Sequence, residues 1–170
     1  MARTIWTVGH STLPLEDFLE VVADVDVLAD VRRFPASRRH PHFSGESLAK
    51  AKPYRWFEAL GGRRSGDGGR HTALRAKAFR AYAAWAETPE FLRALEDLER
   101  LAAGRRTAVL CAEAVWFRCH RMILSDILTA RGWDVRHLPG GKPHRLTKGA
   151  RPTSDGVVYD DGESAQARLW

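Results

Sequence analysis

Two acidic residues stand where apolar segments of this sequence end, in positions suited to acid–base chemistry. Asp30 lies near the end of the run VLADV, and Glu113 closely follows the run TAVLC. A carboxylate in such a place can activate water, act as a general base or stabilise a developing positive charge. Both residues also have a structural alternative, since Asp30 can instead pair with the nearby Arg32 or cap a loop, and Glu113 is open to a similar interpretation.

His10 is the third candidate for a catalytic role. It follows Gly9 in a predicted turn after an apolar segment, where an imidazole can bind a ligand or transfer a proton. A histidine that is hydrogen-bonded to the backbone of its own turn is the alternative. Ser11 or Thr12 is expected to cap a helix that begins near Leu15.

The two cysteines, Cys111 and Cys119, raise the question of thiol chemistry. Thiol phosphatases place an arginine after five intervening residues, but Phe117 occupies that position here and Arg118 comes one residue late. The intervening segment also lacks the glycines of a phosphate-binding loop. The spacing therefore argues against phosphatase chemistry, and Cys111 can equally be a small apolar residue of the core.

The same region offers candidate metal ligands, namely Cys111, Cys119 and His120, together with His10. Their spacing contains neither a paired Cys-x-x-Cys nor the His-x-Glu pattern of the zinc deaminases. We therefore predict that the protein binds no metal and uses no cofactor.

Arginine supplies most of the positive charge. The net charge is +6 and the isoelectric point about 9.8. Guanidinium groups bind phosphates and stack on bases, so this pattern favours a polyanionic partner such as DNA, although a solvated rim or a composition unrelated to binding is the alternative. Arg38, Arg39 and Arg64 are expected on the same edge as the site. The residues predicted to contact a substrate are Trp6, Gly9, Ser11, Arg32, Arg33, Phe34, Pro35, Ser37, Gly61, Gly62, Arg63, Cys111, Trp116, Cys119, His120 and Arg121.

Apolar runs rich in β-branched and aromatic residues predict strands, and amphipathic segments between them predict helices. Thr88, followed by Pro89, is typical of a helix start, and Gly104 is typical of a helix end. Strands are expected at 4–8, 27–31, 54–57, 107–111 and 133–138. Helices are expected at 15–23, 73–85, 89–103 and 119–130.

This alternation predicts a single three-layer α/β domain, with a mostly parallel sheet and helices on both faces. Residues 1–138 are expected to form the domain. Residues 139–170 are expected to form an extension, basic and then acidic, that packs on the domain or trails from it. Ligands of such sheets bind beyond the carboxyl ends of the strands. Since the polar residues described above follow strand ends, we expect them to form one site at that edge.

The bulk composition bounds the class of protein. Hydrophobic residues make up 44% of the chain, which argues against disorder. No apolar run is long enough to span a bilayer, so no membrane association is expected. The chain enters an apolar run directly after its first residues, and we therefore expect no signal peptide, reduced thiols and a cytoplasmic location.

A family resemblance is carried by four segments in this order: TVGHST, DVRRFPASRRHPHF, LGGRR and LCAE…CHR. They resemble the family named Domain of Unknown Function 488, over about Ile5 to Leu138. The resemblance implies a compact α/β domain whose shared motifs surround one cleft. It also implies DNA base excision, because release of 5-hydroxymethylcytosine is associated with some members.

The leading functional hypothesis is a DNA glycosylase of DNA repair that flips a modified cytosine, 5-hydroxymethylcytosine being favoured, out of double-stranded DNA and hydrolyses its N-glycosidic bond. Cleavage builds positive charge on the sugar, which Asp30 or Glu113 would stabilise, while His10 contacts the base. Two alternatives stay open. One is a thiol-dependent or phosphate-handling enzyme that uses Cys111 and Arg121. The other is a nucleic-acid-binding module without activity.

Overall fold

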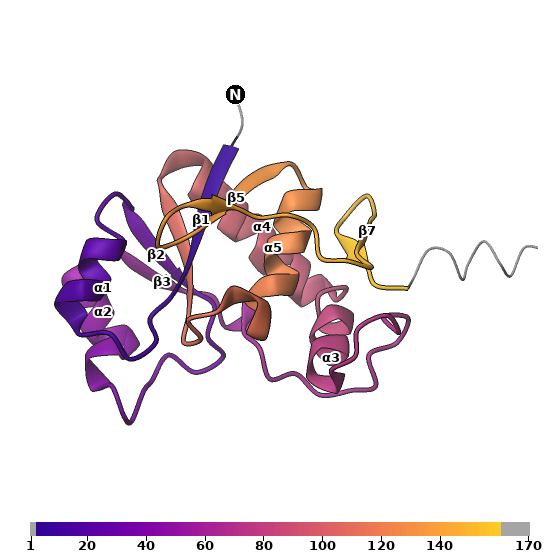
Figure 1. The fold of residues 1–170 in the computed structure, drawn as a ribbon, viewed down its shortest axis with the longest axis horizontal. Helices are drawn as coiled ribbons and strands as arrows, with labels where there is room; N and C mark the ends of the chain where they lie inside the picture. Colours follow the sequence, from indigo (N-terminus) through magenta and orange to yellow (C-terminus); the bar gives the residue numbers. More distant parts are fainter. Residues whose placement is uncertain (1–2, 161–170) are drawn as a thin grey trace, which may run out of the picture.

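The computed structural model describes residues 3–160, which contain a six-stranded sheet flanked by helices (Figure 1). Its strands lie in the order β3-β2-β4-β1-β5-β6. Neighbouring strands from β3 to β5 are parallel, and β5 and β6 are antiparallel. The strands are β1 (Arg3–Gly9), β2 (Val27–Asp30), β3 (Tyr54–Trp56), β4 (Thr107–Cys111), β5 (Trp133–His137) and β6 (Lys142–Pro143), and β7 (Arg151–Pro152) pairs with β8 (Val157–Val158) in a separate ribbon.

Helices cover both faces of the sheet, so the predicted three-layer α/β architecture is confirmed. On one face, Phe18 and Leu48 from α1 and α2 pack against Val8 and Leu110 of the sheet. On the other face lie α4 and α5, with α3 beside α5 (Figure 1). The α-helices are α1 (Leu15–Val21), α2 (Gly45–Ala51), α3 (Lys77–Trp85), α4 (Pro89–Gly104) and α5 (Arg121–Ala130).

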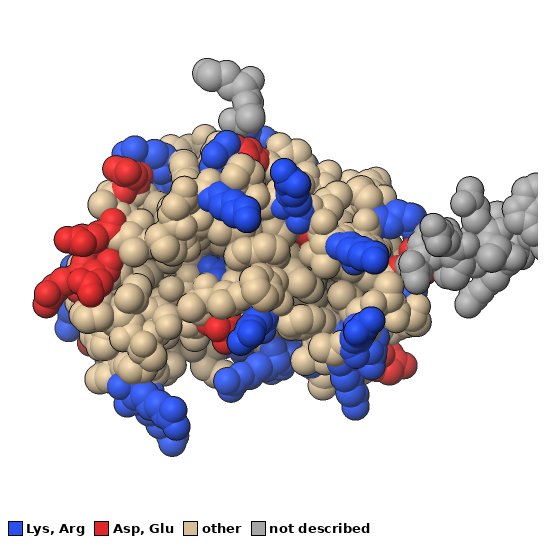
Figure 2. Space-filling view, viewed as in Figure 1, with Lys and Arg blue, Asp and Glu red and all other residues tan. Residues whose placement is uncertain are grey.

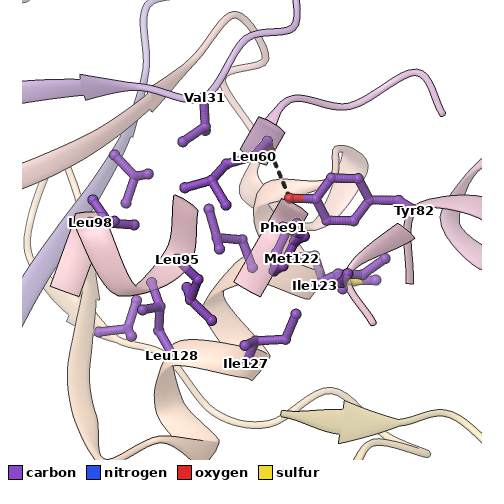
Figure 3. Close-up of a cluster of buried hydrophobic side chains, with 14 of the residues drawn as sticks. Val31, Leu60, Tyr82, Phe91, Leu95, Leu98, Met122, Ile123, Ile127 and Leu128 are labelled. Atoms are coloured by element: carbon purple, nitrogen blue, oxygen red, sulfur yellow. Dashed lines mark hydrogen bonds between the residues drawn. The ribbon is translucent and has the colours of Figure 1, made fainter. Parts of the chain in front are cut away.

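The larger core lies between the sheet and helices α3 to α5. Leucine, isoleucine and phenylalanine side chains from these helices fill it (Figure 3). Ile5 faces this core, whereas Val8 faces the opposite core, as the two-residue periodicity of a strand requires. The hydroxyl of Tyr82 satisfies its hydrogen bond inside the core by donating to the carbonyl oxygen of Leu60 (2.7 Å). Within residues 3–160, no helix has the length and apolar composition to cross a membrane.

The five predicted strands and four predicted helices are all present, and their ends differ from the prediction by at most four residues. Thr88 caps α4 as expected, since its side chain accepts a hydrogen bond from the N–H of Phe91. Helix α2 and the two-residue strands β6, β7 and β8 are not predicted from the sequence. Strands of two residues are too short for a periodic pattern. In α2 the one large apolar side chain is Leu48, so no apolar stripe marks this helix in the sequence.

The prediction that Ser11 or Thr12 caps the first helix is wrong. The N-cap position of α1 is Pro14, and no side chain forms a capping hydrogen bond there. The backbone of Ser11 instead donates to the carbonyl oxygen of Ala112 (2.9 Å), which ties the loop after β1 to the loop after β4.

The segment from 139 to 160 packs on the domain through buried polar groups. Tyr159 is fully buried beside α5 and belongs to the larger core. A chain of hydrogen bonds joins this segment to α5 and to the sheet: Thr7 Oγ1 to His137 Nδ1 (2.6 Å), His137 Nε2 to His144 Nδ1 (2.9 Å), His144 Nε2 to Asp126 Oδ1 (2.7 Å), and the Tyr159 hydroxyl to Asp126 Oδ2 (2.6 Å).

Tyr159→Phe should lower the free energy of unfolding by about 1.5–3 kcal/mol, because it removes a hydrogen bond to a buried carboxylate. Burial raises the pKa of Tyr159, so the hydroxyl is a proton donor at all relevant pH values. Urea denaturation provides the measurement. Tyr82→Phe is the matched control and should cost only about 0.5–1.5 kcal/mol, since its partner is a neutral carbonyl. Equal losses in the two variants would contradict this account.

Candidate functional site

A cavity of about 700 Å³ opens at the carboxyl edge of the sheet. Its walls come from the loops after β1, β2 and β4, from Gly62 and Arg63, and from α3. Parallel strands bring their carboxyl ends to one edge, which is why these segments meet. Figure 2 shows Lys and Arg side chains along the lower margin of the molecule, where the same loops lie in Figure 1. Of the predicted site residues, those lining the cavity are His10, Ser11, Arg32, Arg33, Phe34, Ser37, Gly62, Arg63, Cys111, Glu113, Cys119 and His120.

Three glycines allow these loops to pack closely. A Cβ atom at Gly9 would lie 1.8 Å from the carbonyl oxygen of Glu113, and one at Gly61 would lie 2.5 Å from the backbone of the loop after β2. Gly62 lies against the ring of His120 in the same way. Any side chain at Gly9 or Gly61 would therefore force the backbone apart. Gly9 and Gly61 serve the packing of loops and do not line the cavity, whereas Gly62 does.

Asp30 is fully buried and forms an ion pair with Arg32. Its Oδ1 accepts from Nε and from the backbone N–H of Arg32 (2.9 and 3.0 Å), and its Oδ2 accepts from Nη2 of Arg32 (2.7 Å) and from the hydroxyl of Tyr54 (2.5 Å). Arg32 lines the cavity, but Asp30 does not. The geometry thus matches the structural interpretation of Asp30, which holds Arg32 in place and has both oxygens occupied.

His10 is a neutral hydrogen-bond acceptor in this site. Its Nδ1 lies 2.8 Å from the carbonyl oxygen of Ser11 and so carries the ring proton, while Nε2 lies 3.4 Å from Nη1 of Arg32. Burial lowers the pKa of His10 to about 4, and the charge of Arg32 acts in the same direction. At neutral pH the ring therefore has no second proton to donate to a substrate.

His120 presents a second neutral ring to the cavity. Its Nε2 donates to the carbonyl oxygen of Val31 (2.7 Å), which leaves Nδ1, on the side of Gly62, as an acceptor. Burial lowers the pKa of His120 to about 4. Nδ1 is therefore the nitrogen of this ring that can accept a hydrogen bond.

Glu113 is the carboxylate of the cavity. Among residues 3–160, no other aspartate or glutamate lines it. The residue is exposed, and Oε1 makes one long hydrogen bond to the N–H of Val115 (3.4 Å). Its backbone is held firmly, because the carbonyl oxygen accepts from the buried guanidinium of Arg121 (2.9 Å). An open carboxylate on an anchored loop can approach a bound ligand without a large change of backbone.

The mouth of the cavity carries what we call the arginine rim, which consists of Arg33, Arg38, Arg39 and Arg63. Phe34 projects among them with 60% of its side chain exposed, and the guanidinium of Arg33 lies 5.7 Å from the centre of its ring. A single exposed apolar side chain is common on protein surfaces, but this ring stands beside cationic groups at the cavity. The rim therefore combines a binding surface for anions with an aromatic platform.

Two residues of the cavity wall have strained backbones. Ser11 and Arg63 have φ angles of 50° and 56°, in the left-handed region that favours glycine. Such conformations cost about 1–3 kcal/mol each and are concentrated at functional sites. Their presence on one cavity supports its functional importance.

Cys111 and Arg121 lie beneath the loop after β4. Cys111 is buried, and the hydrogen bond with Cys119, together with burial, raises the pKa of its thiol well above the usual value. Arg121 is 1% exposed and donates to the carbonyl oxygens of Glu113 and Ala114 (2.9 and 3.1 Å). A phosphate-binding loop presents backbone N–H groups to its ligand, whereas in this loop the backbone carbonyl groups face Arg121. Arg121 therefore lies below the predicted arginine-rich edge instead of on it.

Residues 15–128 match the family model described as Domain of unknown function DUF488. This chain belongs to that family. The family resemblance that the four sequence segments carry is thus confirmed. No curated protein and no solved structure shows a match to the chain. The matched DUF488 residues include the loops after β2 and β4, while β1 with His10 and the segment from 139 to 160 lie outside them.

Three further predicted contact residues of this DUF488 protein lie outside the cavity. Trp6 packs with the core beneath α1, and the carbonyl oxygen of Pro35 accepts a hydrogen bond from the start of α2 (2.8 Å). Trp116 stacks on His137, with ring centres 4.5 Å apart and planes 3° from parallel. The side chains of Trp6 and Trp116 are engaged by packing partners, and the backbone of Pro35 is tied to α2.

Helix α3 supplies a wall of the cavity that the positions of the strand ends do not predict. Phe79 and Tyr82 line the cavity, although α3 follows a long loop and not a strand of the main sheet. Arg64, predicted at the open edge, instead lies over the ring of Trp85 at 4.3 Å and helps to fix α3. The lining residues outside the predicted contact set are Thr12, Ala36, Arg38, Arg39, His40, Ala78, Phe79, Tyr82, Ala112 and Ala114.

Asp30→Asn should lower the free energy of unfolding by about 3–5 kcal/mol, because it leaves the guanidinium of Arg32 buried without an opposite charge. Urea denaturation of the variant measures the loss. Asp97→Asn changes a partly exposed carboxylate of α4 and should stay close to the wild type. If the two variants are equally stable, the ion pair is not a main support of the site.

Three histidines whose pKa is lowered in the folded chain should make the folded protein sensitive to acid. Burial lowers the pKa of His10 and His120 from 6.5 to about 4 and that of His137 to about 3. In acid the unfolded chain binds protons that the folded chain does not. The stability that the neutral rings contribute is therefore complete above about pH 6.5 and is lost as the pH falls toward 4. For each unit by which the pH falls in this range, protonation of one histidine in the unfolded chain lowers the free energy of unfolding by at most about 1.4 kcal/mol.

Urea denaturation at about pH 7.5 and about pH 5 measures this loss. His10→Asn places an amide near the position of Nδ1 and should reduce the dependence on pH, since one titrating ring is gone. A stability that does not change over this range would contradict the assignment of neutral rings.

Proposed function

We propose that this protein is a DNA base-excision enzyme that hydrolyses the N-glycosidic bond of a base flipped into the cavity. The observation that carries the proposal is the open carboxylate of Glu113 in a cavity that is also lined by arginines and by the neutral rings of His10 and His120. The substrate expected from the family resemblance is a modified cytosine, 5-hydroxymethylcytosine being favoured, in double-stranded DNA.

Glu113 supplies the negative charge that this reaction needs. Departure of the base leaves positive charge on the sugar ring, and a nearby carboxylate stabilises this charge while it accepts a proton from the attacking water. Asp30 has an equal claim on sequence alone, but it lies outside the cavity with both oxygens bonded. In our proposal Asp30 therefore acts by positioning Arg32.

Arg32 and His120 suit the departing base. The base leaves with the electron pair of the broken bond, so it requires hydrogen-bond donors, and Nη1 of Arg32 is bonded only to His10 among residues 3–160. His120 offers its Nδ1 as an acceptor. Cytosine carries an exocyclic amine that can donate to such a nitrogen.

The arginine rim and Phe34 suit the DNA around a flipped base. Guanidinium groups neutralise phosphates and give binding that weakens with salt. An exposed aromatic ring can fill the gap that a flipped base leaves in the stack, or stack on the base itself. The cavity of about 700 Å³ lies within the range of about 300–1,000 Å³ that small-molecule sites have.

The alternatives find less support in the geometry. A nucleophilic role for Cys111 requires a thiolate, but its thiol is buried and its pKa is raised. Handling of phosphate through Arg121 requires an open guanidinium, but this group lies beneath the loop that it supports. A nucleic-acid-binding module without activity shares the arginine rim, so experiment must separate it from the enzyme.

The test is incubation of the protein with DNA duplexes that carry one cytosine, 5-methylcytosine, 5-hydroxymethylcytosine, uracil or 5-hydroxymethyluracil, followed by mass analysis of free base and abasic DNA. We expect release of one modified base. Glu113→Gln should lower the rate by at least about 100-fold, since it removes the charge and the proton acceptor. DNA binding by this variant should remain and should weaken with salt, because the arginine rim is intact.

Glu46→Gln is the matched control, since Glu46 is a largely exposed carboxylate on α2, and this variant should keep full activity. Unchanged release by Glu113→Gln would overturn the assigned mechanism. Salt-dependent binding without release of any base would indicate a binding module. The absence of both binding and release would contradict the proposal as a whole.

A further inference from the structure

Two thiols meet at the wall of the cavity, and the proposed hydrolysis uses neither. The Sγ atoms of Cys111 and Cys119 lie 3.3 Å apart, and both residues line the cavity. The chain contains no other cysteine. Cys111 ends β4 and Cys119 precedes α5, so the loop between these elements brings the sulfurs together. A disulfide bond of about 2.05 Å requires only a short further approach.

A buried cation lies beside these thiols. Arg121 is 1% exposed, and within residues 3–160 its guanidinium donates to carbonyl oxygens and to no carboxylate, while Nε and Nη1 have no hydrogen-bond partner. Its backbone N–H donates to Sγ of Cys119 (3.3 Å). A buried charge is costly unless an opposite charge accompanies it. A thiolate at Cys119 supplies that charge.

The two sulfurs are not equivalent. The hydrogen bond from Cys111 lowers the pKa of Cys119 to about 7, and the charge of Arg121 acts in the same direction. The pKa of Cys111 is raised. Cys119 is also partly exposed, whereas Cys111 is buried. A reagent in the cavity therefore meets Cys119 first, and near neutral pH a substantial fraction of this thiol is the reactive thiolate.

We propose that Cys119 and Cys111 form a reactive dithiol that exchanges with low-molecular-weight disulfides entering the cavity, with Cys119 as the attacking sulfur and Cys111 as the resolving one. The proposal stands on the geometry of the two thiols and Arg121, and it is independent of base excision.

The exchange has two steps. The thiolate of Cys119 attacks one sulfur of the small disulfide, forms a mixed disulfide and expels the other half as a thiolate, which takes up a proton. Cys111 then loses its proton, attacks Sγ of Cys119 and expels the second half, which is protonated in turn. The protein loses two electrons and two protons, and the small disulfide becomes two thiols.

The test is incubation of the reduced full-length protein with oxidised glutathione near neutral pH, followed by intact-mass measurement and peptide mapping. The wild type should lose the mass of two hydrogen atoms and yield a peptide in which Cys111 is joined to Cys119. Cys111→Ser should instead retain one glutathione on Cys119, because the resolving thiol is absent. Cys119→Ser should react at least about tenfold more slowly than Cys111→Ser, since its remaining thiol is buried and protonated.

The same reaction in urea is the control, because unfolding exposes both thiols equally. A wild-type protein that stays reduced when folded but is oxidised when unfolded would overturn the proposal and leave both cysteines as core residues. Adducts that form equally fast on the two variants would overturn the assignment of attacking and resolving roles. Circular dichroism establishes whether each variant is folded. Where a variant is not folded, the comparison of folded with urea-unfolded wild-type protein decides the test alone.

Discussion

The buried ion pair between Asp30 and Arg32 is the interaction on which the rest of the site depends. Two charges can be buried at the end of a central strand only when each satisfies the other. Asp30 belongs to β2, takes a hydrogen bond from Tyr54 on β3, and directs Arg32 toward His10 after β1. One carboxylate thus connects three parallel strands. It also anchors the beginning of the loop that carries most of the arginine rim.

A second structural support of the site comes from residues after position 128, which the family match does not include. Trp116, in the loop between the two cysteines, stacks on His137 of β5. His137 in turn belongs to the buried chain of hydrogen bonds that runs through His144 to Asp126 of α5. The position of the loop that carries Glu113 is therefore coupled to the packing of residues 139–160. Side chains far from the cavity therefore help to hold the backbone of this loop in place.

The sequence by itself determined the architecture and the edge at which the site lies. Strand and helix periodicity depends on neighbouring residues, so the alternation of elements, the start of α4 at Thr88 and its end at Gly104 are all local. Parallel topology then places the ends of β1, β2 and β4 at one edge, and the arginines that follow β2 in the sequence indicate that this edge is cationic. Twelve of the predicted site residues, His10, Ser11, Arg32, Arg33, Phe34, Ser37, Gly62, Arg63, Cys111, Glu113, Cys119 and His120, line the cavity found there.

Only the tertiary structure decided what each of these residues does. Asp30 and Glu113 have similar positions after strands, yet one is buried in an ion pair and the other is open to the cavity. Burial likewise makes the rings of His10 and His120 neutral and hides Arg121 beneath its loop. Exposure, charge state and pairing depend on atoms from segments remote in the sequence, such as α3 and the loop after β4. Local pattern therefore locates the site, whereas its chemistry is set by packing.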